Sequence, residues 1–238
     1  MRSPDLWRIR NLSISHRFIV ICDDSVANAV DVDIFPFVDI RVTSLTRTFS
    51  GSCNVAGASV VLNPDSRYYS AISEKLKSMP DTLHPADAMV LSMNSQNLEQ
   101  RVGRCNTNAL SVVKLLNEHE LVERVHHPSL NNRKLLYGRH RRKEGGYGHV
   151  LTVKFENPNH AKRFYNTLKI AKGPGYGTSF SNCLPVIEFG YREEAKLFEE
   201  HPPQLLLMSI GMEEEQSIIQ AVENVLSRLE MRDRRHYR

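Results

Sequence analysis

Three neighbouring side chains at residues 44–47 have the chemistry to bind a phosphate group. Ser44 and Thr46 carry short hydroxyls that can donate hydrogen bonds to phosphate oxygens, and Arg47 carries a planar guanidinium that can pair with two oxygens at once. A lysine at such a place could lose its proton and attack an aldehyde, whereas a guanidinium, whose pKa exceeds about 12, cannot. Taken alone, Arg47 is more often an ordinary surface arginine at a turn. A Ser-x-Thr pair is weak evidence in isolation because such pairs are common in turns, but Arg47 beside it retains the chemistry to bind a phosphate.

The elements around these residues predict α/β organisation. A continuous apolar run at 18–22, ended by Asp23, is typical of a buried parallel strand, and further strands are predicted at 39–44 and 58–62. Ser44 and Thr46 are two residues apart at the end of the second strand, so we expect both side chains on one face. Both hydroxyls are then available to one anion.

The remainder of the chain predicts a second α/β region. Hydrophobic periodicity predicts two or three strands there, with helices on one face. One long helix at 85–119 is expected to contain the domain boundary, which divides the chain into residues 1–100 and residues 101–238. The other predicted elements are helices at 5–16, 66–78, 160–170 and 213–231, and strands at 121–125, 150–155 and 205–210.

Residues 39–64 read strand, hydroxyl pair, cation, aromatic, Ser-Gly, Asn-Val-x-Gly and strand. This order resembles the pyridoxal phosphate (PLP) attachment segment of the Cys/Met-metabolism enzymes, and it is most similar to the fungal cystathionine gamma-synthase branch. Two later stretches, 172–180 and 205–213, resemble an active-site loop and a strand of the same family. The resemblance implies an α/β fold, with a partial PLP-dependent transferase large domain (aspartate aminotransferase-like, fold type I) followed by a small C-terminal α/β domain.

The resemblance also implies roles for five residues. Asp23 would pair with the pyridine nitrogen of the cofactor, and Ser44 and Thr46 would hold the cofactor phosphate. Arg47 replaces the lysine that forms the Schiff base, so pyridoxal 5'-phosphate is the expected cofactor but covalent attachment is not expected. Leu207 replaces the arginine that clamps the alpha-carboxylate of the amino-acid substrate. Two functions needed for turnover are therefore altered.

Composition narrows the class of protein. The chain has 238 residues, of which 41% are hydrophobic and 24% charged, as in ordinary globular proteins. A net charge of +4 is too small and too dispersed to imply nucleic acid, and the basic cluster at 133–143 is interpreted as a solvated loop. Widely spaced cysteines, and the lack of an apolar run of membrane-spanning length, predict a cytoplasmic protein with no metal and no membrane association.

The resemblance covers residues 4–230 and only the later half of the family. We therefore expect a truncated, catalytically degenerate protein with an exposed sheet edge and apolar face, whose ancestral reaction was gamma-replacement on an activated homoserine with cysteine. One alternative is a fragment of an active PLP enzyme acting on an amino acid, whether gamma-synthase, gamma-lyase or beta-lyase. The other is a non-catalytic subunit that forms a homo-oligomer or pairs with an intact paralogue.

Overall fold

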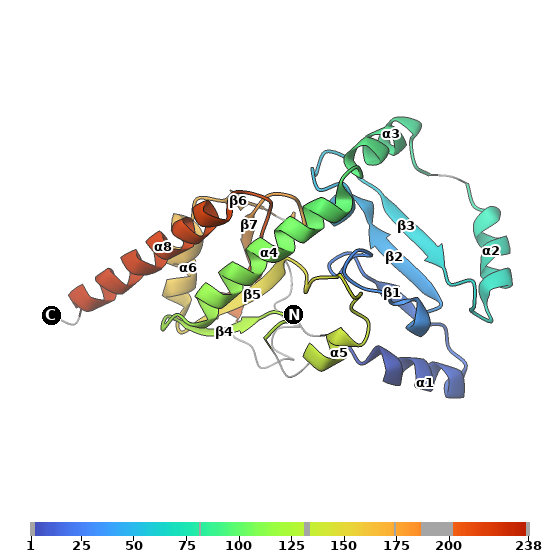
Figure 1. Cartoon of the computed structure of the whole chain (residues 1–238), viewed down its shortest axis with the longest axis horizontal. Coiled ribbons are helices and arrows are strands. Elements are labelled where there is room, and N and C mark those ends of the chain that lie inside the picture. Colours follow the sequence, from blue (N-terminus) through green and yellow to red (C-terminus); the bar gives the residue numbers. More distant parts are fainter. Residues whose placement is uncertain (1–2, 81, 131–133, 174, 187–201, 237–238) are drawn as a thin grey trace.

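The computed structural model describes residues 3–80, 82–130, 134–173, 175–186 and 202–236 (Figure 1). The first part of the chain contains α1 (Leu6–His16), β1 (Ile21–Asp23), η1 (Phe35–Phe37), β2 (Ile40–Ser44), η2 (Leu45–Phe49), β3 (Ala58–Leu62), α2 (Tyr69–Lys77) and α3 (Pro85–Asn94). The second contains α4 (Leu98–Asn117), β4 (Val122–His126), α5 (Lys134–Gly138), β5 (Val150–Phe155), α6 (Pro158–Thr167), β6 (Ala171–Lys172), β7 (Asn182–Pro185), η4 (Pro202–Gln204), β8 (Leu205–Ser209) and α8 (Glu215–His236).

The first sheet has the strand order β1-β2-β3. β1 runs parallel to β2, with Asp23 opposite Val42, and β3 runs antiparallel to β2, with Ala58 opposite Ser44. Parallel strands have their carboxyl ends at the same edge of a sheet, which is where open α/β sheets bind ligands. Asp23 and Ser44 therefore lie at one edge of this sheet.

The strand predicted at 18–22 is shorter and more exposed than expected. Regular pairing is limited to Ile21–Asp23, and Ile21 is 61% exposed because β2 is the only neighbour of β1 in the described sheet. Val60, on the same sheet face by register, is 50% exposed. The prediction of a buried strand was wrong, whereas the predicted exposure of a sheet edge and an apolar face is confirmed.

Two helices replace the single helix predicted at 85–119. α3 begins at Pro85, where the missing amide hydrogen of proline does no harm, and ends at Asn94. Asn97 then adopts a left-handed conformation with φ of 59°, which interrupts the helical path before α4 begins. Asparagine tolerates this conformation better than most residues. α4 continues from the first sheet to the second (Figure 1).

The second sheet has five strands in the order β4-β5-β8-β7-β6, so the prediction of two or three was too low. The missed strands β6 and β7 are too short, at two and four residues, to give a periodic signal. Helices α4, α6 and α8 pack on one face through a common apolar core. On β5, Leu151, Val153 and Phe155 all point into this core and are fully buried, as their alternation predicted. Burial of each such side chain contributes about 1.5–3 kcal/mol.

The basic cluster at 133–143 was interpreted as a solvated loop, and in its described part Lys134, Arg139, Arg142 and Lys143 are exposed, although the segment is not a simple loop. Lys134–Gly138 forms the short helix α5, and Tyr137 and His140 are buried. Arg141 forms an isolated bridge with Val32, and Arg142 Nε donates to the Ala29 carbonyl oxygen at 2.8 Å. The Tyr137 side chain and these two polar contacts therefore hold the cluster to the segment that follows β1.

Candidate functional site

The segment that carries Arg47 is a single π-helical turn. η2 directly follows β2, and the amide of Ser50 donates to the Leu45 carbonyl oxygen at 3.0 Å, an i to i+5 bond. Arg47 itself departs from helical geometry, with φ −83° and ψ −122°. Such turns are rare and occur frequently at functional sites. The turn projects the Arg47 side chain from the carboxyl edge of the first sheet.

The Arg47 guanidinium lies on an aromatic ring from the second half of the chain. Its Cζ is 3.7 Å from the centroid of the Tyr176 ring, a close cation–π geometry. Its Nη1 atom is buried and has no hydrogen-bond partner among the described residues. A buried donor without an acceptor is unfavourable, and an anion oxygen would satisfy it.

Ser44 and Thr46 do not share a strand face. β2 ends at Ser44, so the alternation of strand side chains does not extend to Thr46 in η2, and the expectation of a common face was wrong. The Thr46 hydroxyl instead accepts a hydrogen bond from the amide of Gly57 at 3.0 Å. The Ser44 amide donates to Ser25 Oγ at 2.7 Å, which ties the end of β2 to the turn after β1.

The two consecutive aspartates at the end of β1 have different environments. Asp24 is buried and forms an ion pair with Arg41, with 2.7 Å between Oδ2 and Nε. Burial raises the pKa of Asp24, although the bond from Thr43 and the Arg41 charge oppose the shift. Asp23 is exposed, and its Oδ1 accepts from the Ser25 amide at 2.9 Å. The Asp24 carboxylate is therefore engaged in an internal ion pair, and Asp23 is the carboxylate exposed at the sheet edge.

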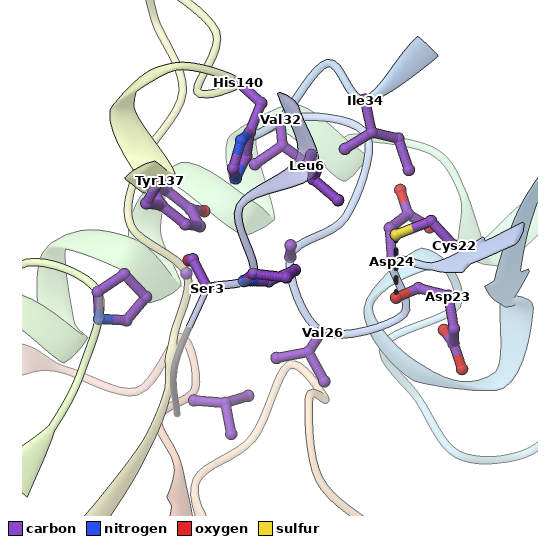
Figure 2. Close-up of a pocket in the computed structure, with 15 residues that line it drawn as sticks. Ser3, Leu6, Cys22, Asp23, Asp24, Val26, Val32, Ile34, Tyr137 and His140 are labelled. Carbon is purple, nitrogen blue, oxygen red and sulfur yellow. Dashed lines mark hydrogen bonds between the residues drawn. The ribbon is translucent and has the colours of Figure 1, made fainter. Parts of the chain in front are cut away.

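A cavity of about 180 Å³ adjoins these aspartates (Figure 2). Its walls come from segments that are far apart in the sequence, including Leu6, Cys22, Asp23 and Tyr137. The Tyr137 hydroxyl is buried and has no hydrogen-bond partner in the described part of the chain. The cavity thus lies between the first sheet and the segment that contains Tyr137 and His140.

The described residues between β6 and β7 contact the segment that carries Arg47. The Gly177 amide donates to Ser209 Oγ at 2.8 Å, and the Gly177 carbonyl oxygen accepts from Thr48 Oγ1 at 3.1 Å. Leu207 and Ser209 lie on the same face of β8, opposite the core residues Leu206 and Met208. This places Leu207 on the sheet face that also contacts the loop beside Arg47.

Arg101 is a residue of this region that the sequence interpretation missed. It is half-buried on α4 and donates hydrogen bonds to the segment after Arg47 and to Ser179 of the loop. The available signal was its position one helical turn after Leu98, beside the predicted apolar stripe. A charged residue there needs buried partners, but the sequence does not identify them.

The described residues contain neither a candidate metal site nor a membrane-spanning helix. No group of three or more His, Cys, Asp or Glu side chains there could hold a metal ion. None of the helices in the same residues is long and apolar enough to cross a membrane.

The sequence matches the family described as Cys/Met metabolism PLP-dependent enzyme over residues 1–227. It is 39% identical over 237 residues to a cystathionine gamma-synthase-like protein of Aspergillus thermomutatus, covering 98% of this chain and 42% of that protein. It is 34% identical over 213 residues to the cystathionine gamma-synthase of Neurospora crassa, covering 88% of this chain and 34% of that protein. The chain thus spans less than half the length of either relative.

Solved structures share the fold. Cystathionine gamma synthase from Xanthomonas oryzae pv. oryzae, in complex with aminoacrylate and cysteine, has a TM-score of 0.86 at 21% identity, covering 97% of this chain and 60% of that chain. A putative O-acetylhomoserine (thiol)-lyase from Campylobacter jejuni has a TM-score of 0.83 at 20% identity, covering 94% and 62%. These likenesses confirm the predicted α/β fold type I class. The chain therefore belongs to the family of Cys/Met metabolism PLP-dependent enzymes, and the two relatives named above are a cystathionine gamma-synthase and a cystathionine gamma-synthase-like protein of fungi.

Proposed function

We propose that this protein is a catalytically degenerate member of the cystathionine gamma-synthase-like family. It binds the phosphate of PLP reversibly through Ser44, Thr46 and Arg47, and it does not attach the cofactor covalently. PLP, when bound, supplies an electron sink for amino-acid chemistry. The observation that carries the proposal is the buried Nη1 of Arg47 in η2, a cationic donor that has no hydrogen-bond partner among the described residues and that an anion oxygen would satisfy.

The side chains at the site are suited to binding the cofactor phosphate and not to attaching the cofactor covalently. Arg47 and the neighbouring hydroxyls provide charge-assisted and neutral donors at one edge of the sheet. A guanidinium cannot act as the amine nucleophile, because it does not lose its proton under physiological conditions. In the same proposal Asp23 faces the ring nitrogen of the cofactor. Binding without attachment follows from these side chains.

A second altered position supports the loss of turnover. Leu207 lies on the face of β8 that contacts the loop beside Arg47, where the family places an arginine for the substrate carboxylate. An apolar side chain cannot replace charge-assisted contacts, which contribute about 1.5–3 kcal/mol each. Gamma-replacement on an activated homoserine is therefore the ancestral reaction and not a present activity. In this proposal residues 1–100 form the cofactor-binding part and residues 101–238 form the smaller domain.

The test compares the wild-type protein with Arg47→Lys. Each is mixed with PLP, its visible absorption is recorded, and the mixture is reduced with borohydride before peptide mass analysis. The wild type should bind PLP reversibly and show no pyridoxyl adduct, whereas Arg47→Lys should carry an adduct at residue 47. An adduct on any wild-type lysine would instead favour an active PLP enzyme with a relocated amine.

Turnover gives an independent arm of the same test. The wild type should form no cystathionine from an activated homoserine and cysteine. The double variant Arg47→Lys, Leu207→Arg restores the amine and the carboxylate clamp, and it is the variant in which any residual competence should appear. Product formation by the wild type would overturn the proposal of degeneracy.

A second candidate function is that of a non-catalytic subunit. The observation in its favour is the exposed apolar face of the first sheet, on which Ile21 and Val60 are 61% and 50% exposed. Faces of this kind favour association. Light scattering of the purified protein, alone and mixed with an intact paralogue, distinguishes a monomer, a homo-oligomer and a mixed complex. A monomer under both conditions would exclude this role.

A further inference from the structure

Arg101 donates hydrogen bonds to three separate segments around the anion site. Its Nη1 donates to the Thr48 carbonyl oxygen at 3.2 Å and to Ser179 Oγ at 3.0 Å. Its Nη2 donates to the Phe49 carbonyl oxygen at 2.7 Å and to the Asn94 carbonyl oxygen at 2.9 Å. These acceptors belong to η2, to the end of α3 and to the loop after β6. One guanidinium therefore connects all three.

The acceptors of Arg101 are all uncharged. Three are backbone carbonyls and one is a hydroxyl, so the positive charge is not neutralised by a carboxylate among these contacts. Burial lowers the pKa of Arg101. A half-buried guanidinium without a counter-ion is costly, and the planar fork recovers part of that cost only when several acceptors lie in fixed positions. The segments it joins are thus held in one arrangement.

A backbone hydrogen bond also joins two of these segments. The Ser179 amide donates to the Gly51 carbonyl oxygen at 2.9 Å. Gly51 has φ of +74°, and a Cβ atom there would lie 2.2 Å from Ser179 Oγ and 2.4 Å from Arg101 Nη1. A larger residue there would be strained at this positive φ and would displace the Ser179 or Arg101 side chain. The chain on either side of this contact carries Arg47 and Tyr176, whose side chains stack.

We propose that Arg101 is a positioning residue of the anion site. By holding residues 48–51 against residues 176–179, it places the Arg47 guanidinium on the Tyr176 ring with Nη1 directed to the anion. This proposal rests on the proposed function, because it concerns the same phosphate site. Arg101 itself makes no contact with the anion, and its effect on affinity passes through Arg47.

The experiment uses the full chain with Arg101→Lys, and Arg104→Lys as the matched control. Arg104 is on the same helix, its side chain is 53% exposed, and its ion pair with Glu214 is long at 3.7 Å. Inorganic phosphate and PLP are titrated by calorimetry, and stability is measured by urea unfolding. Arg101→Lys should weaken binding by about tenfold or more, the change expected when a charge-assisted contact is misplaced. Arg104→Lys should bind as the wild type does, and equal affinity in all three proteins would overturn the proposal.

A double-mutant cycle separates positioning from general stability. In a Tyr176→Leu background the stack is already lost, so Arg101→Lys should cause little further loss of phosphate affinity. Additive losses would show that Arg101 acts through the fold alone and would refute its role at Arg47. Ser179→Ala removes one acceptor without altering charge, and it should give a smaller loss in the same direction. That variant keeps the test decisive if Arg101→Lys fails to fold.

Failure of the proposed function can be recognised separately. If the wild type binds neither phosphate nor PLP, the anion site is refuted, and hydrogen exchange of peptides covering residues 44–51 and 175–180 then tests the positioning. Exchange should be faster in Arg101→Lys and unchanged in Arg104→Lys. Unchanged exchange in both variants would refute the positioning role, whatever the site binds.

Discussion

The unpartnered Nη1 of Arg47 leads to a prediction that links stability to anion binding. Arg47→Met keeps a long unbranched side chain at the site but removes the charge and the donors. The wild-type guanidinium gains from its stack on Tyr176, at 3.7 Å, and loses from the buried Nη1 that has no acceptor in the described structure. The balance of these terms determines the sign of the change in the ligand-free protein.

The free-energy terms predict that Arg47→Met is at least as stable as the wild type when no anion is bound. A cation–π contact contributes about 0.5–2 kcal/mol, and a buried unsatisfied donor costs about 1–3 kcal/mol. Arg47→Met should therefore leave the free energy of unfolding unchanged or raise it by about 1 kcal/mol. With ligand at a hundred times its dissociation constant, the wild type should gain about 2.7 kcal/mol. The variant should gain less than about 1 kcal/mol, because it lacks both charge-assisted contacts.

The assay is urea unfolding with and without phosphate or PLP, and tyrosine fluorescence monitors the transition. Arg67→Met is the control, because Arg67 also lies on a tyrosine ring, with its Cζ 4.9 Å from the Tyr68 centroid, and donates to the Ser13 carbonyl oxygen. The control should be destabilised without ligand and should gain as much from ligand as the wild type does.

Two results would refute the reasoning. Equal stabilisation of the wild type and Arg47→Met by the ligand would show that the anion binds elsewhere. Destabilisation of Arg47→Met by more than about 2 kcal/mol without ligand would show that Nη1 has a partner that stabilises the fold, since that exceeds the stacking term.

Three further predictions concern pH and thiol chemistry. Burial raises the pKa of Asp39, but the hydrogen bonds that its carboxylate accepts outweigh burial and hold this pKa below its usual value. The ionised Asp39 therefore stabilises the fold above about pH 4, and this contribution is lost as pH falls through the pKa of the folded state. Asp39→Asn should remove that part of an acid-unfolding curve. Burial lowers the pKa of His127 and of His149 to about 4, and the unfolded chain therefore binds protons that the folded chain does not between about pH 6.5 and 4. The free energy of unfolding should fall by up to about 3 kcal/mol for each histidine as pH decreases from about 6.5 to about 4. The urea midpoint should depend less on pH when His127 is replaced by glutamine, and an unchanged pH dependence would contradict this. Cys53 is exposed and should react first with a thiol reagent. Burial raises the pKa of Cys105 to about 12, so this thiol should react only on unfolding. Mass analysis of timed samples measures the order, and earlier reaction of Cys105 would contradict the prediction.

Local patterns in the sequence were enough for most of the longer regular elements and for a hypothesis about the type of chemistry. Alternation placed Leu151, Val153 and Phe155 on the core face of β5, and all three are fully buried. The helix predicted at 160–170 corresponds to α6, and the side chain of Asn157 before its first residue accepts from the amides of two following residues. The cation and hydroxyls at residues 44–47 could be identified because they lie within four residues of one another. Each of these signals depends on neighbours within a few residues, where steric and hydrogen-bonding preferences act directly.

Tertiary structure alone decided how the site is assembled. The stack of Arg47 on Tyr176 joins residues 129 positions apart, as does the bond between Thr48 and Gly177. The role of Arg101 depends on carbonyls whose directions follow from η2 and from the break at Asn97. No local preference encodes such contacts, because their geometry is set by the packing of one sheet and its loops against the other. The sequence therefore determined which groups are available, and the packing determined which of them meet.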